Sequence, residues 1–154
     1  MRHAKSSWKD TSLSDLDRPL NGRGRRAAVA MAKRLRIAGY IPDLVIVSSA
    51  LRTQQTAQAL QKVYHGQLRL ITEPILYEAT PADYETVIRR VDEAVDHLMM
   101  IGHNPTMEWL ASVLSGRDVT LPTAAYIRFK IANQWQHFSI TPCVEMDYDF
   151  PKSR

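Results

Sequence analysis

The stretch at residues 43–60, DLVIVSSALRTQQTAQAL, combines two patterns that together predict the fold. Residues 43–48 form a short apolar run rich in β-branched side chains, which is typical of a strand buried on both faces. Residues 50–64 then place Leu51, Ala57 and Leu60 at helical spacing, with Gly66 as the stop. A strand followed at once by a helix is the unit from which parallel sheets with helical layers are built.

The same alternation continues in both directions along the chain. Apolar runs predict further strands, and 3.6-residue periodicity between turn signals predicts further helices. The strands are expected at residues 68–72 and 98–102, and the helices at 22–38 with Gly39 as its stop, from Thr80 through Val95, and from Asn104 to Gly116.

The last part of the chain, AYIRFKIA (125–132) and QWQHFSI (134–140), alternates like two antiparallel strands around a turn at Asn133. The whole pattern predicts an α/β protein: a three-layer α/β/α sandwich with a mostly parallel central sheet. In such sheets ligands bind beyond the carboxyl ends of the strands.

Length and composition favour a single domain, residues 1–154. The lone cysteine, Cys143, cannot form an internal disulfide, which favours a reducing compartment. We find no signal-peptide pattern and no apolar run long enough to span a bilayer, so we expect a cytoplasmic protein without a membrane partner. The net charge of +4 suits an anionic ligand. The basic residues between Arg18 and Arg36 could contact nucleic acid, but we favour a solvated helix face and expect no nucleic-acid partner.

Two reactive side chains fall just after predicted strands. Arg52 follows strand 43–48 and His103 follows strand 98–102, so both are expected on the same edge of the sheet. Arg2 and His3 open the chain. Two guanidinium groups match phosphate oxygens, and a histidine among them is pushed toward its neutral, nucleophilic form. Together with a second histidine, and with the helix start at Asn104, they suit attack on phosphorus.

Other chemistry finds less support in the sequence. A single histidine is more often structural than catalytic, and His65, His97 and His137 have no partner motif. No spacing of histidines and cysteines predicts a metal site, and no phosphate-binding Gly-rich loop predicts a nucleoside triphosphate. We therefore expect neither a metal nor another cofactor.

Five segments in order resemble one known family. They are RHAKSSW (2–8), DRPLNGRGRR (17–26), SSALRTQQTA (48–57), LYEA (76–79) and IGHNP (101–105). They are similar to the corresponding segments of the histidine phosphatase superfamily, which has the phosphoglycerate mutase-like fold, and most of all to its small SixA-type phosphohistidine phosphatases. The resemblance covers nearly the whole chain.

The resemblance implies roles by position. His3 would be the nucleophile that becomes transiently phosphorylated, and Arg2, Arg52 and His103 would bind the phosphoryl group. Glu78 would donate a proton to the leaving group and then act as base on water.

Three further residues are candidate substrate contacts: Arg18, Asn21 and Asn104. The segment that holds Arg18 and Asn21 can also start the first helix, and we favour that role. Members of the family carry a short apolar strand immediately before the Arg-His pair. We expect that strand to be missing from the sequence as given.

The leading hypothesis is a metal-independent phosphatase that works through a phosphohistidine on His3, most favourably on phosphohistidine in a protein. Short loops without a long insertion support a pocket open to a side chain on a folded partner. The alternative is a broad-specificity phosphomonoesterase of small molecules. A phosphate-binding module without turnover is a weaker alternative.

Overall fold

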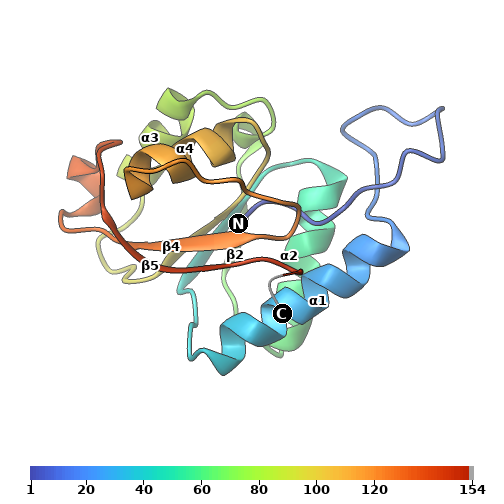
Figure 1. Cartoon of the computed structure of the whole chain (residues 1–154), viewed down its shortest axis with the longest axis horizontal. Helices are drawn as coiled ribbons and strands as arrows, with labels where there is room; N and C mark the ends of the chain where they lie inside the picture. The colour runs from blue at the N-terminus through green and yellow to red at the C-terminus, as the bar shows by residue number, and fades with distance from the viewer. Residues whose placement is uncertain (153–154) are drawn as a thin grey trace.

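Strand β1 (Leu44–Val47) is the centre of a parallel three-stranded sheet in the computed structural model, which describes residues 1–152 (Figure 1). It pairs with β2 (Leu70–Thr72) on one side and with β3 (Leu98–Ile101) on the other. Val45 lies opposite Leu70 in one neighbour and Met99 in the other. The strands expected around residues 43–48, 68–72 and 98–102 are therefore present. The last two residues of the expected domain lie outside the described part.

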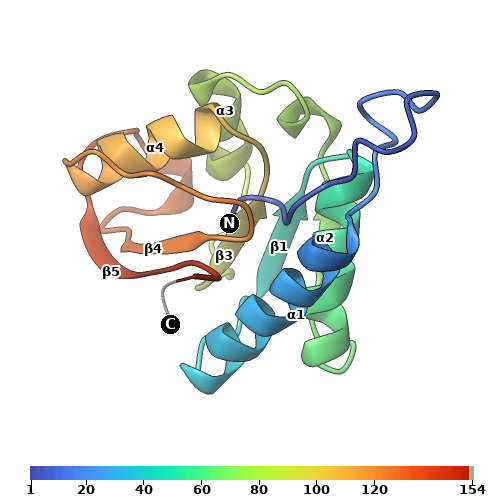
Figure 2. The same ribbon diagram turned by 45° about the vertical axis from the view of Figure 1, so that its right-hand side comes forward.

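All four residues of β1 are buried because helices cover both faces of the sheet (Figure 2). Val45 and Val47 pack into a core with α1 (Gly22–Ile37) and α2 (Leu51–Val63). Leu44 and Ile46 point the other way, into a second core with α3 (Pro81–Arg89) and α4 (Thr106–Ser115). Successive strand residues face opposite sides. The expected three-layer α/β/α architecture is confirmed.

Helix α3 begins where the sequence predicts and ends earlier. Thr80 and Asp83 form a reciprocal capping box at its start. The helix ends at Arg89, so the expectation that it continues through Val95 is wrong. The chain leaves the helix in a turn in which the Asp92 carboxylate accepts a bond from the Ala94 amide at 2.8 Å. Val95 is still buried, because the turn returns it to the core.

A separate two-stranded sheet closes the chain. β4 (Tyr126–Lys130) pairs antiparallel with β5 (Val144–Asp149), with an irregularity between Arg128 and Phe129. The strand predicted at 134–140 is wrong, because that segment contains a 3₁₀ turn, η2 (Trp135–His137). The Trp135 indole donates to the Val95 carbonyl at 2.6 Å, and the side chain packs against the second core. A second 3₁₀ turn, η1 (Pro74–Leu76), precedes α3.

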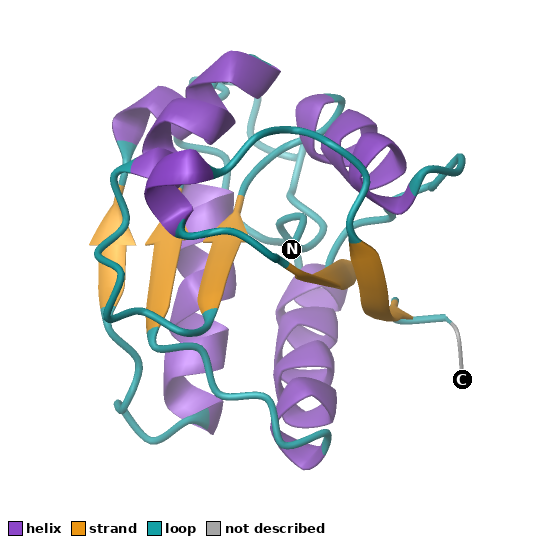
Figure 3. Cartoon of the chain, turned by 90° about the vertical axis from the view of Figure 1, so that its left-hand side faces the viewer, coloured by secondary structure: helices purple, strands orange, loops and turns teal. Residues whose placement is uncertain are grey.

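Residues 1–3 lie between the two sheets (Figure 3). Arg2 forms a parallel bridge with Gly102, directly after β3, and the His3 amide donates to the Gly102 carbonyl at 3.1 Å. On the other side, the Ala124 amide donates to the His3 carbonyl at 3.0 Å, and the Arg2 amide donates to the Ala125 carbonyl at 2.9 Å. This short segment therefore ties the parallel sheet to the chain that enters β4.

A groove of about 650 Å³ continues from Met1 between β3 and β4. The Met1 amino group, buried there, donates to the Met100 carbonyl at 2.8 Å, and burial lowers its pKa to about 5. The strand that the resemblance predicts ahead of Arg2 stays a prediction. None of the helices within residues 1–152 combines the length and apolarity that crossing a bilayer requires.

Candidate active site

A pocket of about 720 Å³ opens at the carboxyl edge of the parallel sheet. The segment after β3, the first turn of α2 and the segment that begins at Arg2 all contribute to its wall. The predicted site residues that line it are Arg2, His3, Arg18, Arg52, Glu78, His103 and Asn104. Side chains separated by about a hundred positions in the sequence thus share one cavity.

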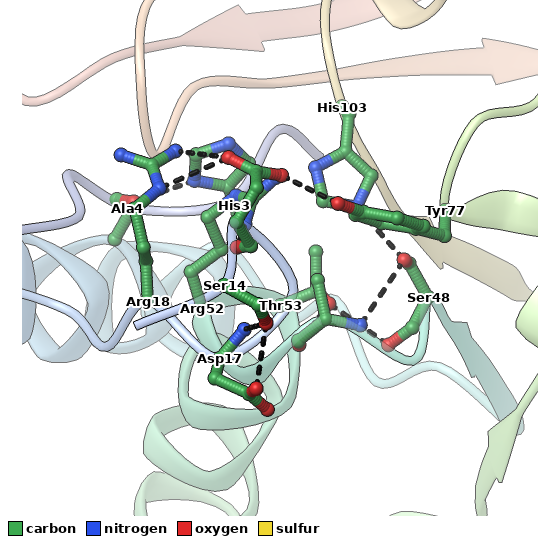
Figure 4. Close-up of polar contacts among 12 residues, drawn as sticks. His3, Ala4, Ser14, Asp17, Arg18, Ser48, Arg52, Thr53, Tyr77 and His103 are labelled. Atoms are coloured by element: carbon green, nitrogen blue, oxygen red, sulfur yellow. Dashed lines mark hydrogen bonds and ion pairs between the residues drawn. The ribbon is translucent and has the colours of Figure 1, made fainter. Parts of the chain in front are cut away.

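His3 and His103 face each other across the pocket floor, with ring centroids 5.2 Å apart (Figure 4). The Nδ1 atom of His3 lies 2.7 Å from the Ala4 carbonyl oxygen, which can only accept a hydrogen bond. Nδ1 therefore carries the proton, and the lone pair of a neutral His3 is on Nε2. The Nε2 atom of His103 is 2.8 Å from the Ser48 hydroxyl, which fixes that ring at the end of β1.

Both imidazoles are held in the neutral form. Burial, together with the positive charges of Arg52 and Arg2, lowers the pKa of His3 to about 4 against the opposing effect of the bond to Ala4. Burial also lowers the pKa of His103 to about 3, with His3 and Arg52 acting in the same direction. At pH 7 the pocket thus offers an uncharged nitrogen nucleophile beside fixed cations.

The guanidinium groups retain donors for an anion. Arg52 lies buried in the first turn of α2, and Arg2 donates through Nη1 to the Leu121 carbonyl at 2.9 Å. Within residues 1–152, the Nε atoms of Arg2 and Arg52 and the Nη1 atom of Arg18 are buried without a hydrogen-bond partner. Since buried donors are normally satisfied, these atoms point to a ligand with several acceptor oxygens.

Two glycines allow the chain to pack closely around the nucleophile. A side chain at Gly102 would collide with the Tyr84 hydroxyl, which lies against the strand that supports Arg2 and His3. A side chain at Gly24 would collide with the backbone of Lys5. The first turn of α1 therefore rests directly on the segment after His3.

The remaining predicted residues occupy different positions around the pocket. Glu78 is exposed at its rim, in the loop between η1 and α3. Asn104 lines the wall, and its amide nitrogen donates to Glu108 Oε2 and to the Leu121 carbonyl, both at 3.2 Å. The Oδ1 atom of Asn104 is buried and has no partner within the described residues.

The structure corrects one of the candidate substrate contacts, Asn21, which caps the first helix instead. Its Oδ1 atom accepts from the Gly24 amide at 2.8 Å and caps α1, and its Nδ2 atom donates to the Ser6 carbonyl at 3.2 Å. It does not line the pocket. Arg18, from the same segment, does line it, and its guanidinium stacks 3.4 Å from the centre of the Trp8 ring.

Three residues that contact the predicted site residues were not predicted from the sequence. Ser48 holds His103, and its place at the carboxyl end of the strand predicted at 43–48 was an available signal. Tyr77 precedes Glu78 in the LYEA segment, and its hydroxyl donates to Asp15 at 2.6 Å. Asp15 lies in a polar loop without any local pattern that distinguishes it from its neighbours.

The geometry suits binding of a tetrahedral oxyanion next to a nucleophilic imidazole. Preorganised cationic donors surround the place where charge would develop, in a partly buried pocket. Within residues 1–152, no cluster of three or more histidine, cysteine, aspartate or glutamate side chains has an arrangement that could hold a metal ion.

Known proteins match this chain over most of its length. A family model described as histidine phosphatase superfamily (branch 1) matches residues 1–120. An uncharacterized protein of Mycobacterium tuberculosis is 34% identical over 146 residues, which covers 88% of this chain and 89% of that protein. A solved structure from Agrobacterium tumefaciens, described as a SixA phosphohistidine phosphatase, is 33% identical, with a TM-score of 0.75 over 81% of this chain and 84% of its own. The protein histidine phosphatase SixA complexed with tungstate has the same fold, with a TM-score of 0.81 at 20% identity over 98% of this chain and 94% of its own.

Proposed function

The chain belongs to the histidine phosphatase superfamily and is a phosphatase; from this premise we propose that it acts through a covalent phosphohistidine on His3 and that its substrate is phosphohistidine on a protein. One observation carries the proposal. The buried, neutral His3 has its Nε2 lone pair free in a pocket that also holds Arg2, Arg52 and His103.

Binding comes first in the proposed reaction. The phosphoryl oxygens accept hydrogen bonds from Arg52 and Arg2, whose forked donors suit a tetrahedral anion. His103 supplies a further contact. Because these groups are already fixed by the fold, little reorganisation is needed when charge builds up on the phosphoryl oxygens.

The nucleophilic step forms one bond and breaks another. The Nε2 lone pair of His3 forms a bond to phosphorus while the bond from phosphorus to the leaving nitrogen or oxygen breaks, and the bonding electrons depart with that atom. The Nδ1 proton stays bonded to the Ala4 carbonyl, which stabilises the positive charge that the ring acquires. For an ester, Glu78 gives its proton to the leaving oxygen.

Hydrolysis completes the cycle. Water attacks the phosphorus of phospho-His3, Glu78 takes a proton from that water, and the N–P bond breaks to return neutral His3 and free phosphate. A phosphohistidine substrate depends less on Glu78 than an ester does, because imidazole is a better leaving group than an alkoxide.

The substrate class rests on the opening of the pocket. Glu78 is exposed at the rim. An open rim suits a side chain carried by a folded partner, and the 33%-identical relative described as a SixA phosphohistidine phosphatase supports the same class. The acid at Glu78 favours the second candidate, a broad-specificity phosphomonoesterase. The expected cytoplasmic location stays a prediction.

The test is to capture the intermediate. The protein is mixed with a phosphohistidine peptide, quenched in alkali within a fraction of turnover, and analysed by mass spectrometry. We expect acid-labile phosphate on His3 in the wild type and none in His3→Ala, with turnover lost. His137→Ala is the matched control, since His137 is exposed on η2 and away from the pocket. Phosphatase activity that survives in His3→Ala would refute the mechanism. A panel of phosphohistidine peptides, phosphoserine peptides and sugar phosphates separates the two substrate classes.

A further inference from the structure

The phosphoryl site already holds an anionic side chain of the protein itself. The Asp15 carboxylate accepts from Arg52 Nη2 at 3.0 Å and from the Tyr77 hydroxyl at 2.6 Å through Oδ2. Its Oδ1 atom accepts from Arg18 Nε and Arg18 Nη2, both at 3.0 Å. The Asp15 carbonyl accepts from Arg52 Nη1 at 2.6 Å. Both terminal nitrogens of Arg52 therefore donate to one residue.

Asp15 also reaches the two-histidine centre electrostatically. Its charge raises the pKa of His103, against the larger effects of burial and of neighbouring cations. The hydrogen bond from Tyr77 and the positive charge of Arg52 lower the pKa of Asp15 itself to about 2, so the carboxylate is ionised at neutral pH. An ionised carboxylate bound to these donors resembles a phosphate oxygen in charge and in hydrogen bonding.

The loop that carries Asp15 is built so that it can move. Residues 9–17 are exposed, and 49% of the Asp15 side chain remains accessible. Bonds inside the loop are local, such as those of Asp10 with Ser12 and of Ser14 with Asp17. The loop is anchored at its base instead, where the Ser7 amide donates to the Pro19 carbonyl at 2.8 Å. In Figure 1 this loop projects from the body of the molecule.

Besides Asp15, the loop has one other backbone bond to α2, in which the Leu51 amide donates to the Leu16 carbonyl at 2.9 Å. Release of Asp15 from Arg52 and Tyr77 would break the hydrogen bonds given above but would leave the helix intact. The Arg52 side chain of this ion pair is 7% exposed and stays in place, whereas the Asp15 side chain is 49% exposed and can leave. A dianionic phosphoryl group offers Arg52 more charge and more acceptor oxygens than the carboxylate does, so it can displace the carboxylate.

We propose that Asp15 is an internal competitor for the phosphoryl site: its carboxylate occupies Arg52 in the empty pocket, is displaced when a phosphoryl group binds, and returns as free phosphate leaves. This inference rests on the proposed function, because it takes Arg52 as a phosphoryl ligand. Asp15 thereby sets how tightly the pocket holds free oxyanions, and it favours release of the product.

The expected gain in phosphate affinity on removal of Asp15 follows from the fraction of molecules in which the pocket is open. Apparent affinity is reduced by the fraction of molecules in which the site is free. If Asp15 occupies Arg52 in about nine molecules of ten, its removal tightens phosphate binding by about tenfold.

The experiment is calorimetric titration of inorganic phosphate into the full chain at fixed pH and ionic strength. We expect Asp15→Asn and Asp15→Ala to bind phosphate about tenfold more tightly than the wild type. Asp17→Asn is the matched control, because it removes the same charge from the same loop, where Asp17 accepts from Ser14 rather than from a pocket cation. It should change the dissociation constant by less than about twofold.

Equal phosphate affinity in the wild type and in both Asp15 variants would overturn the inference. An equal gain in phosphate affinity in Asp17→Asn would overturn it as well, because the gain would then come from the change in net charge. If phospho-His3 still forms in either case, the proposed function stands and the competitor alone fails. If neither the wild type nor the Asp15 variants bind phosphate, and no phospho-His3 forms, both are overturned.

Discussion

Mild acid should destabilise this protein through His3. A histidine has a pKa near 6.5 in an unfolded chain, and burial lowers the pKa of His3 to about 4 in the fold. Between these values the unfolded chain binds a proton that the folded protein excludes, so stability falls as the pH drops from about 6.5 to about 4. Above pH 7 both states are neutral at this position, and the contribution is constant.

The magnitude follows from the two pKa values. Proton linkage gives a loss of about 2 kcal/mol in the free energy of unfolding between pH 7 and pH 5, which grows to about 3 kcal/mol below pH 4. His103, with its pKa lowered to about 3, acts in the same direction. For a domain of this size these losses are a substantial part of the total stability.

The assay is urea unfolding followed by circular dichroism at pH 7 and pH 5, in buffer without phosphate. The variant is His3→Asn, whose amide can still donate to the Ala4 carbonyl. The free energy of unfolding of His3→Asn should fall by about 2 kcal/mol less than that of the wild type between the two pH values. Contributions that both proteins share cancel in this difference. The control His137→Asn changes an exposed site, and its free energy of unfolding should fall by as much as that of the wild type. An equal loss in His3→Asn and the wild type would refute the reasoning.

Three further outcomes are expected. Gly102→Ala should lower the free energy of unfolding by about 1–3 kcal/mol, because the new methyl group collides with the Tyr84 hydroxyl; urea titration measures it. Arg34→Met should cost about 3 kcal/mol or more in the same measurement, since it removes the ion pair at 3.0 Å from a carboxylate, Asp149, that is 5% exposed. Glu78→Gln should lower kcat for phosphoesters by about a hundredfold and kcat for phosphohistidine much less, because only the ester needs strong acid assistance; steady-state kinetics with both substrates measures the difference.

Matched variants separate these causes from general damage. Gly22→Ala adds the same methyl group where it meets only the ends of arginine side chains, so its cost should be smaller than that of Gly102→Ala. Arg117→Met breaks an exposed pair with Glu145 and should cost less than about 1 kcal/mol. A larger loss of stability in Gly22→Ala than in Gly102→Ala would contradict the packing argument. A larger loss in Arg117→Met than in Arg34→Met would contradict the burial argument. Equal losses for both substrates in Glu78→Gln would count against its role as the acid.

Local patterns were sufficient for the parallel half of the fold. Residues 44–47 are apolar throughout because helices cover both faces of β1, and α2 follows with a regular apolar face. The hairpin was predicted only in part. Trp135 looks like a strand residue in an alternating segment, but its indole finds a partner at Val95 that only the folded chain provides. β5 carries charged residues and forms by pairing with β4. No local sequence pattern predicts that pairing.

The site was predictable where its residues follow strands. Arg52 and His103 lie where parallel strands end, so the order of strands and helices in the sequence is enough to predict their common edge. Arg2 and His3 reach that edge through bonds to Gly102 and to residues 124–125, which are contacts distant in sequence. The place of Asp15 depends on the course of an exposed loop, and no periodicity describes such a loop.

Residues 1–3 hydrogen-bond both to Gly102 at the end of β3 and to residues 124–125 just before β4, so the imidazole of the proposed nucleophile is positioned by the junction between the two sheets. If the bonds to residues 124–125 opened, His3 would lose one of its two backbone anchors while all four helices kept their shape. We therefore expect the rate of turnover to depend on how firmly the parallel sheet is joined to the β4–β5 hairpin. The circular-dichroism signal of the helices does not depend on that junction. Loss of catalysis under mild stress would not imply an unfolded chain.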